Sequence, residues 1–354
     1  MIKSWRRTIV YMYPYKGEDD RLMLQGIKNK DWKELALEVL DGRGITKEEA
    51  VSILRAPDEE LLDILQAAFL IRHKYYGKKV KLNMIINAKS GLCPEDCGYC
   101  SQSIVSEAPI DKYAWLTKDK IMEGAQEAIR RKAGTYCIVA SGRQPTDNEI
   151  DHVVSAVEEI RQTTDLKICC CLGFLNESHA AKLAAAGVHR YNHNLNTSKN
   201  NYEDICSTHT YEDRVDTVQK AKDSGISPCS GAIFGMGESD EEAVEVAFAL
   251  HALDADSIPC NFLNSIDGTP LEGRQELNPR KCLKLLAMMR FVNPSKEIRI
   301  AGGREVNLGS MQVMGLYAAN SIFVGDYLTT IGQEMTSDWG MIKDLGFEIE
   351  ECAL

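Results

Sequence analysis

The chain has 354 residues, with 41 Lys and Arg against 52 Asp and Glu, so its formal net charge is −11 at pH 7. Such an acidic chain lacks the basic surface that binds nucleic acid, and it has no run of about 18 apolar residues to cross a bilayer, so neither nucleic acid nor a membrane is an expected partner. No cleavage site follows the short apolar patch at the start, which predicts a cytoplasmic location. In that reducing compartment the 12 cysteines indicate metal, redox or catalytic chemistry rather than disulfides.

Residues 1–79 are predicted to form a helical extension. Apolar residues from Trp32 onward recur at helical spacing until two glycines interrupt the pattern. Thr46-x-x-Glu49 then has the form of a capping box, which predicts a second helix, and a third follows after a proline. Roughly the first 25 residues match no pattern that we can place, and Met23 is a candidate start.

From residue 80 the sequence alternates between short β-branched apolar runs and longer amphipathic stretches, which is typical of βα units with a parallel sheet. Eight such runs are present, at 80–87, 134–141, 166–172, 190–195, 227–234, 257–263, 297–301 and 321–325. They predict a (βα)8 TIM-type barrel over residues 80–345, with the active site at the C-terminal ends of the strands and a short tail at 346–354. Fewer closed pairings would give a doubly wound sheet instead.

Three cysteines follow the first predicted strand in one loop: Cys93, Cys97 and Cys100. Their spacing, Cys-x3-Cys-x2-Cys, differs from that of structural zinc sites, which use four ligands in two separated pairs. Three thiolates suit a [4Fe–4S] cluster in which one iron keeps an open position. A zinc site completed by a remote Cys or His is the alternative.

The segment GLCPEDCGYCSQ at 91–102 resembles the signature of radical S-adenosylmethionine (SAM) enzymes, and among them that of the biotin synthase family. The likeness spans about residues 80–345, because further family strings occur at 261–263, 268–272 and 321–325. It implies that Cys93, Cys97 and Cys100 bind a [4Fe–4S] cluster whose open iron chelates SAM, with Tyr99 beside the adenine.

Cysteines also occur in the second, third and fifth predicted strands, where alternate residues of a barrel point inward and can converge. A buried, small apolar role is the alternative for each. Alternation places two members of the run 169–171 on one face and the middle one on the other. The resemblance implies that a second, [2Fe–2S] cluster is held by Cys137, Cys169, Cys229 and Arg299. Only its place in the motif separates that arginine from Arg304. The remaining cysteines are expected to pack.

Three amides, Asn192, Asn194 and Asn196, alternate in and just after the fourth predicted strand and would be costly to bury without partners. An amide offers both a donor and an acceptor, as a ureido ring requires, and a satisfied structural network is the alternative. The resemblance implies that Asn192 and Asn194 contact dethiobiotin and that Asn196, where the family often has aspartate, contacts the ribose of SAM.

The resemblance assigns three further residues to SAM. Gly231 and Ile233 belong to a Gly-x-Ile-x-Gly segment with which many such enzymes cradle adenosine, although any strand-to-helix turn can show the pattern. Arg214 matches an arginine that pairs with the methionine carboxylate, a role that suits a planar donor fork. A surface charge on a helix is the alternative for Arg214.

The resemblance implies a radical SAM enzyme that inserts sulfur into dethiobiotin, the last step of biotin biosynthesis. A deoxyadenosyl radical would abstract hydrogen, the second cluster would supply sulfur, and no catalytic residue beyond the clusters is expected. The resemblance also implies a homodimer and a reductant of the flavodoxin or ferredoxin type. The alternatives are a radical SAM enzyme for another small molecule and a zinc-binding structural protein.

Overall fold

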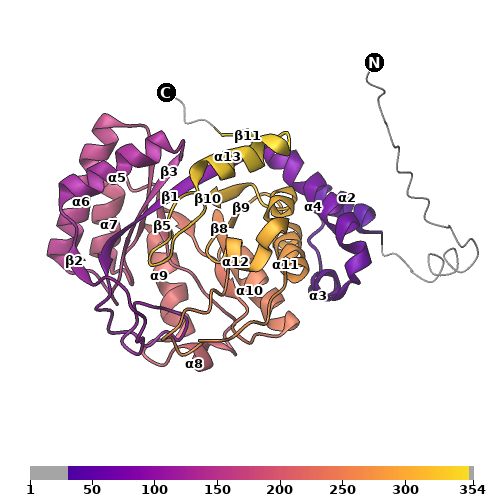
Figure 1. The fold of residues 1–354 in the computed structure, drawn as a ribbon, viewed down its shortest axis with the longest axis horizontal. Coiled ribbons are helices and arrows are strands. Elements are labelled where there is room, and N and C mark those ends of the chain that lie inside the picture. The colour runs from indigo at the N-terminus through magenta and orange to yellow at the C-terminus, as the bar shows by residue number, and fades with distance from the viewer. Residues whose placement is uncertain (1–30, 351–354) are drawn as a thin grey trace, which may run out of the picture.

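The computed structural model describes residues 31–350, in which parallel strands close into a barrel surrounded by helices (Figure 1). Closure comes from the pairing of the last barrel strand with the first, with Lys81 opposite Ser321. The barrel strands are β1 (Lys79–Ser90), β3 (Thr135–Ala140), β4 (Lys167–Cys171), β5 (Arg190–Asn192), β6 (Ser227–Cys229) continued by β7 (Ala232–Phe234), β8 (Ser257–Phe262), β9 (Glu297–Ile300) and β10 (Ser321–Phe323). The predicted TIM-type barrel is therefore confirmed. Each of the eight apolar runs corresponds to one strand of the barrel, with β6 and β7 counted together.

Helices alternate with these strands and cover the outside of the barrel. Capping boxes begin several of them, as at Thr146 and Ser239, where the side chain of the cap accepts from a backbone N–H three residues on. The helices of this layer are α5 (Lys118–Arg130), α6 (Asp147–Thr163), α7 (Glu177–Ala186), α8 (Tyr202–Ile205), α9 (Tyr211–Asp223), α10 (Asp240–Ala252), α11 (Pro279–Val292), α12 (Arg304–Leu308) with the 3-10 turn η2 (Gly309–Tyr317), and α13 (Met335–Asp344).

The N-terminal extension packs beside α10 and α11 (Figure 1). Its helices are α2 (Trp32–Leu40), α3 (Lys47–Arg55), the 3-10 turn η1 (Asp58–Glu60) and α4 (Leu61–Tyr76). The expected capping box at Thr46 and Glu49 is present. Lys284 of α11 donates to the carbonyl of Ala56 at 2.6 Å, which fixes the junction between extension and barrel. Residues 1–30, including Met23, lie outside the described residues.

Two short strands were not predicted. β2 (Tyr113–Trp115) pairs antiparallel with the end of β1, and β11 (Glu348–Ile349) pairs parallel with its beginning. Within residues 31–350, no helix combines the length and apolar composition that crossing a bilayer requires.

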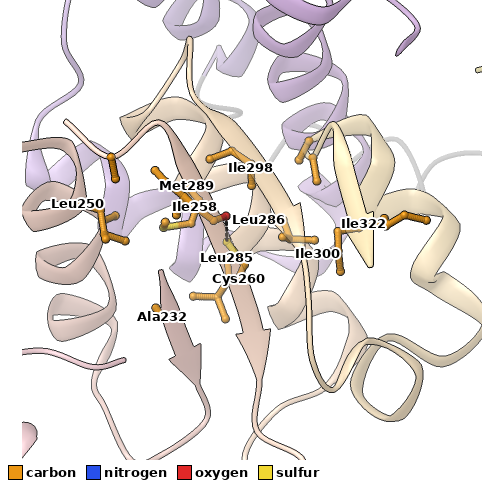
Figure 2. Close-up of a cluster of buried hydrophobic side chains, with 14 of the residues drawn as sticks. Ala232, Leu250, Ile258, Cys260, Leu285, Leu286, Met289, Ile298, Ile300 and Ile322 are labelled. Carbon is orange, nitrogen blue, oxygen red and sulfur yellow. Dashed lines mark hydrogen bonds between the residues drawn. The ribbon is translucent and has the colours of Figure 1, made fainter. Parts of the chain in front are cut away.

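The main core lies between the barrel strands and the helical layer, and part of it is drawn in Figure 2. Ile258 and Cys260 of β8 point into this layer with Leu286 and Met289 of α11. The Sγ of Cys260 lies 3.9 Å from the carbonyl of Ile258, its one hydrogen-bonding contact among the described residues. Cys260 therefore packs outside the barrel lumen, as expected, and so does the fully buried Cys282.

Candidate active site

A cavity of about 390 Å³ opens at the C-terminal ends of the barrel strands. Its wall includes the ends of β3, β4 and β8 and the loop that follows β1. Most of the residues predicted for the site line it: Cys93, Cys97, Tyr99, Cys100, Cys137, Cys169, Asn192, Asn194, Asn196, Arg214, Ile233 and Arg299. Cys229 and Gly231 do not line it, but Cys229 contacts the lining residue Asn192 and Gly231 lies against the lining residue Pro259. Residues from distant parts of the sequence thus converge as a barrel requires.

The cysteine loop after β1 is held by the segment after α8. The N–H of Gly98 donates to the carbonyl of Ile205 at 2.9 Å. The Asp96 carboxylate accepts from the backbone N–H groups of Ser207 at 3.0 Å and Thr208 at 3.2 Å. These bonds orient the loop without using its thiols.

The separations of the loop thiols suit a cluster better than a single ion. Zn–S bonds of about 2.3 Å limit the sulfurs around one zinc to separations of at most about 4.6 Å. Cys93, Cys97 and Cys100 do not form a set within 4.8 Å of one another, because the one such set among the described residues is Cys97, Cys206 and His209. A cubane takes its cysteines on different irons and tolerates the wider spacing.

The set of Cys97, Cys206 and His209 does not suit zinc either. Nδ1 of His209 is hydrogen-bonded to Glu95 at 2.5 Å and Nε2 accepts from Nη2 of Arg214 at 2.8 Å, so neither ring nitrogen is available. A divalent ion would also lie beside the Arg214 guanidinium, which repels it. The residues present therefore fit a [4Fe–4S] cluster and do not support the zinc alternative.

Cys97 of the loop is buried, and Cys93 and Cys100 are partly buried. Burial raises the pKa of Cys100 to about 11 and also raises that of Cys93. The hydrogen bond to Cys206, at an Sγ–Sγ distance of 3.7 Å, and burial together raise the pKa of Cys97. Since thiolates are the metal ligands, assembly of a cluster here releases protons.

A second set of thiols lies on the strands inside the barrel. Cys137 of β3 and Cys169 of β4 are direct neighbours in the sheet register. The interaction of the Cys169 thiol with the thiol of Cys137 is the largest cause of its raised pKa, and the thiol of Cys229 also acts on it. The predicted alternation is confirmed, because Cys169 and Cys171 line the cavity while Cys170 is buried in the outer core.

Arg299 faces these thiols from β9 and is buried. Its Nη2 donates to Glu297 at 2.6 Å and Ser257 at 2.9 Å, and its Nε donates to Ser321 at 3.3 Å. No described residue accepts from Nη1, so that nitrogen is the one left for a ligand. Arg304 instead pairs with Asp338 at 2.7 Å and does not line the cavity.

Glu297 was not singled out in the sequence, although a carboxylate in the apolar strand Glu-Ile-Arg-Ile is unusual. It is 1% exposed and also accepts from Nη1 of Arg190 at 2.9 Å. Burial opposes its ionisation, but Arg299, Arg190 and Lys81 together hold the pKa of Glu297 well below the ordinary value. The ionised carboxylate fixes the guanidinium of Arg299 in the barrel floor.

The three amides reach the cavity by a different path from the one predicted. β5 ends at Asn192, so Asn194 and Asn196 belong to the loop beyond it. At the end of this loop Asn196, with φ of +70°, returns to the sheet through an isolated bridge with Ala232. Nδ2 of Asn192 donates to Oδ1 of Asn194 at 3.0 Å, and Nδ2 of Asn196 donates to the Tyr99 hydroxyl at 2.6 Å. All three still line the cavity.

Arg214 of α9 is buried, not a surface charge. It donates from Nη1 to the carbonyl of Asn194 at 3.0 Å, from Nη2 to Nε2 of His209, and from Nε to the Tyr202 hydroxyl. A guanidinium has five N–H donors, so these three bonds leave one donor on each terminal nitrogen among the described contacts. A pair of adjacent donors is the arrangement that binds a carboxylate in bidentate form.

Gly231 allows two strands to approach each other. A Cβ at this position would lie 1.9 Å from the carbonyl oxygen of Pro259 in β8. Two residues on, Ile233 of β7 reaches the cavity. The turn that follows is closed by Glu238, whose carboxylate accepts from the N–H groups of Gly235 and Met236 at 2.7 and 2.8 Å.

Three residues near the loop thiols were missed in the sequence: Glu95, Cys206 and His209. Glu95 lies inside the cysteine motif and His209 five residues before Arg214, so proximity to the motifs was the available signal. Cys206 was expected only to pack, and its contact with Cys97 depends on a fold that brings positions 109 residues apart together. Cys352, also expected to pack, lies outside the described residues.

Comparison with known proteins agrees with this geometry. The Radical SAM superfamily model matches residues 89–250, and the model of the Biotin and Thiamin Synthesis associated domain matches residues 259–348. The chain is 75% identical over 332 residues to the biotin synthases of Bacillus cereus (strain AH820) and Bacillus anthracis, covering 94% of this chain and 100% of each relative.

Solved structures share the fold at much lower identity. Methylornithine synthase (PylB) aligns with a TM-score of 0.79 and 19% identity, covering 90% of this chain and 97% of that one. The [FeFe]-hydrogenase maturase HydG aligns with a TM-score of 0.76 and 18% identity, covering 95% and 78% respectively. These two likenesses concern the fold alone.

Proposed function

This chain belongs to the biotin synthase family of radical SAM enzymes, and from that premise we propose how its own residues carry the conversion of dethiobiotin into biotin. The family uses a [4Fe–4S] cluster and SAM. The observation that carries the proposal is the presence of two thiol sets around one cavity, the first on the loop at its mouth and the second on the strands within it.

In this proposal Cys93, Cys97 and Cys100 hold the [4Fe–4S] cluster. The donor pair of Arg214 binds the carboxylate of SAM, and Tyr99, Asn196 and Ile233 form the wall beside its nucleoside, while Gly231 lets the strand behind Ile233 approach β8. Support comes from the geometry of Arg214, which is buried at the cavity and keeps two donors on adjacent nitrogens.

Deeper in the cavity, Cys137, Cys169, Cys229 and Arg299 would hold the [2Fe–2S] cluster. When bound, the two clusters and SAM supply the electron, the radical and the sulfur that side chains cannot. The chain's own contribution is to hold the substrate and keep water away from the reacting centre. Asn192 and Asn194 offer amide donors and acceptors between the two thiol sets, where the ureido ring of dethiobiotin would bind.

Metal analysis tests the assignment of the first thiol set. Anaerobically purified Cys97→Ala should lose the oxygen-sensitive cluster and the formation of deoxyadenosine, with iron and sulfide measured beside the wild type. Retention of both by the variant would reject the assignment. An assay with dethiobiotin separates this function from that of a radical SAM enzyme acting on another small molecule.

The family resemblance supports three further parts of the proposal. They are a homodimeric assembly, a reductant of the flavodoxin or ferredoxin type, and a cytoplasmic location. A reducing compartment suits a chain with 12 cysteines and two oxygen-sensitive clusters.

A further inference from the structure

One histidine joins the cysteine loop to the arginine at the cavity. His209 lies between α8 and α9 and is 6% exposed, with the ring of Phe174 at 5.2 Å and that of Tyr202 at 5.9 Å between centroids. Its Nδ1 meets a carboxylate oxygen of Glu95, which lies between Cys93 and Cys97. Its Nε2 meets Nη2 of Arg214. The imidazole is therefore the middle member of a chain from the cluster loop to the arginine.

The partners determine where the proton of His209 lies. A guanidinium donates and has no lone pair to accept with, so Nε2 must be the unprotonated nitrogen. Nδ1 then carries the proton and donates it to Glu95. The Glu95 carboxylate is itself 5% exposed and is fixed by Nη1 of Arg143 at 3.0 Å and by the Thr208 hydroxyl. With its donor end held in this way, the ring presents a lone pair to Arg214.

Arg214 depends on this contact for its orientation. Tyr202 and the carbonyl of Asn194 hold Nε and Nη1, and His209 is the one described partner of Nη2. Without it two hydrogen bonds, from Nε to Tyr202 and from Nη1 to Asn194, would hold the guanidinium, and its plane could tilt away from a bound carboxylate. A bidentate pair requires that the planar fork of the guanidinium lies in the plane of the carboxylate.

We propose that His209, fixed by Glu95, is a positioning residue that aligns the Arg214 guanidinium with the carboxylate of SAM and sets its place relative to the cluster loop. The inference rests on the proposed function, because it takes SAM as the ligand of Arg214. The cysteine motif does not require a histidine at position 209, and the contact between His209 and Arg214 forms only in the folded barrel.

Two substitutions separate the two ends of the ring. In His209→Asn the amide lies near the position of Nδ1, so it can still donate to Glu95 but cannot reach Arg214. In His209→Gln the amide oxygen reaches the position of Nε2 and can accept from Arg214. Binding of SAM to the reconstituted protein, measured by calorimetry without reductant or dethiobiotin, should weaken about tenfold in His209→Asn, as the loss of one charge-assisted hydrogen bond implies. It should weaken by no more than about threefold in His209→Gln.

A control variant and a double-mutant cycle distinguish a specific role of His209 from a general effect on folding. His179→Asn removes another buried histidine, which lies on α7 against Asp147 and away from the cavity, and it should bind SAM as the wild type does. Combining His209→Asn with Arg214→Met should weaken SAM binding no further than Arg214→Met alone, because the histidine acts through the arginine. Iron and sulfide contents should match those of the wild type in every variant.

Equal SAM affinity in His209→Asn and the wild type would overturn the inference, and so would equal losses in the asparagine and glutamine variants. An additive double variant would overturn it as well. None of these outcomes affects the proposed function, which the wild-type protein tests by itself when it binds and cleaves SAM.

Discussion

At the scale of single residues, strand alternation decides which thiols reach the cavity. Cys169 and Cys170 are adjacent in β4, but the first contacts Cys137 and Cys229 while the second packs in the outer core. Their contrast provides a matched pair for testing the second thiol set.

Under the proposed function, Cys169→Ala should lose the visible absorption and the sulfide of the second cluster while keeping those of the first, because Cys169 is proposed as one of its ligands. Cys170→Ala should keep both clusters and lose about 1 kcal/mol of stability from a small cavity. Absorption spectra, sulfide analysis and urea unfolding of the two variants measure this. Equal spectra for both variants would show that Cys169 is no ligand.

The role of a single residue could be predicted where it follows from neighbouring residues in the sequence, and not where it depends on contacts with distant ones. The spacing of Cys93, Cys97 and Cys100 is local and pointed to their chemistry. The link between His209 and Arg214 was not foreseen, because hydrogen-bond partners follow from the orientation of a loop and not from a motif. Glu297 was missed since its meaning depends on arginines of other strands.

At the scale of elements, the approach of β6 and β7 to β8 depends on the absence of a side chain at Gly231. Gly231→Ala should destabilise the protein by about 1–3 kcal/mol, because backbone and not a flexible side chain occupies the space for the new methyl group. Gly340→Ala in α13 is the control and should instead raise the stability by up to about 1 kcal/mol. Nothing lies within 4 Å of the position that the new Cβ would take, and alanine favours a helix over glycine. Thermal unfolding of the two variants and the wild type measures these changes. A Gly231→Ala variant as stable as the wild type would contradict the steric explanation.

The periodicity of the sequence predicted the elements that bury a face. Each of the eight strand positions and the helices of the extension have apolar patterns long enough to recognise. β2 and β11 have three and two residues, too few for a period to appear. The end of β5 was placed too late because the polar run after Asn192 alternates like a strand, whereas the chain there leaves the sheet and pairs again only at Asn196.

At the scale of the whole molecule, the extension and the barrel share one hydrophobic core. Ile64 of α4 is fully buried in the same cluster as Leu286 of α11, and Arg72 of α4 donates to the carbonyl of Ala319 at 3.0 Å. The sequence distinguished the two regions by composition, but it could not show that they are packed together.

Ile64→Ala should therefore lower the stability of the entire chain by about 2–5 kcal/mol in one transition. Leu62→Ala on the same helix, whose side chain is 66% exposed, should change it by less than about 0.5 kcal/mol. Urea unfolding of the cluster-free protein, followed by both fluorescence and circular dichroism, measures the two. Separate transitions, of which Ile64→Ala shifts only one, would show an independent extension.

In the proposed function the inner thiols hold the sulfur that enters dethiobiotin, within reach of the SAM site at the mouth of the same cavity. The most direct test of this assignment is a single turnover by protein whose clusters are reconstituted with heavy-isotope sulfide, followed by mass spectrometry of the biotin formed. We expect heavy sulfur in the product of the wild type and no biotin from Cys169→Ala. Biotin that carries only unlabelled sulfur, or its formation by the variant at the wild-type rate, would contradict it.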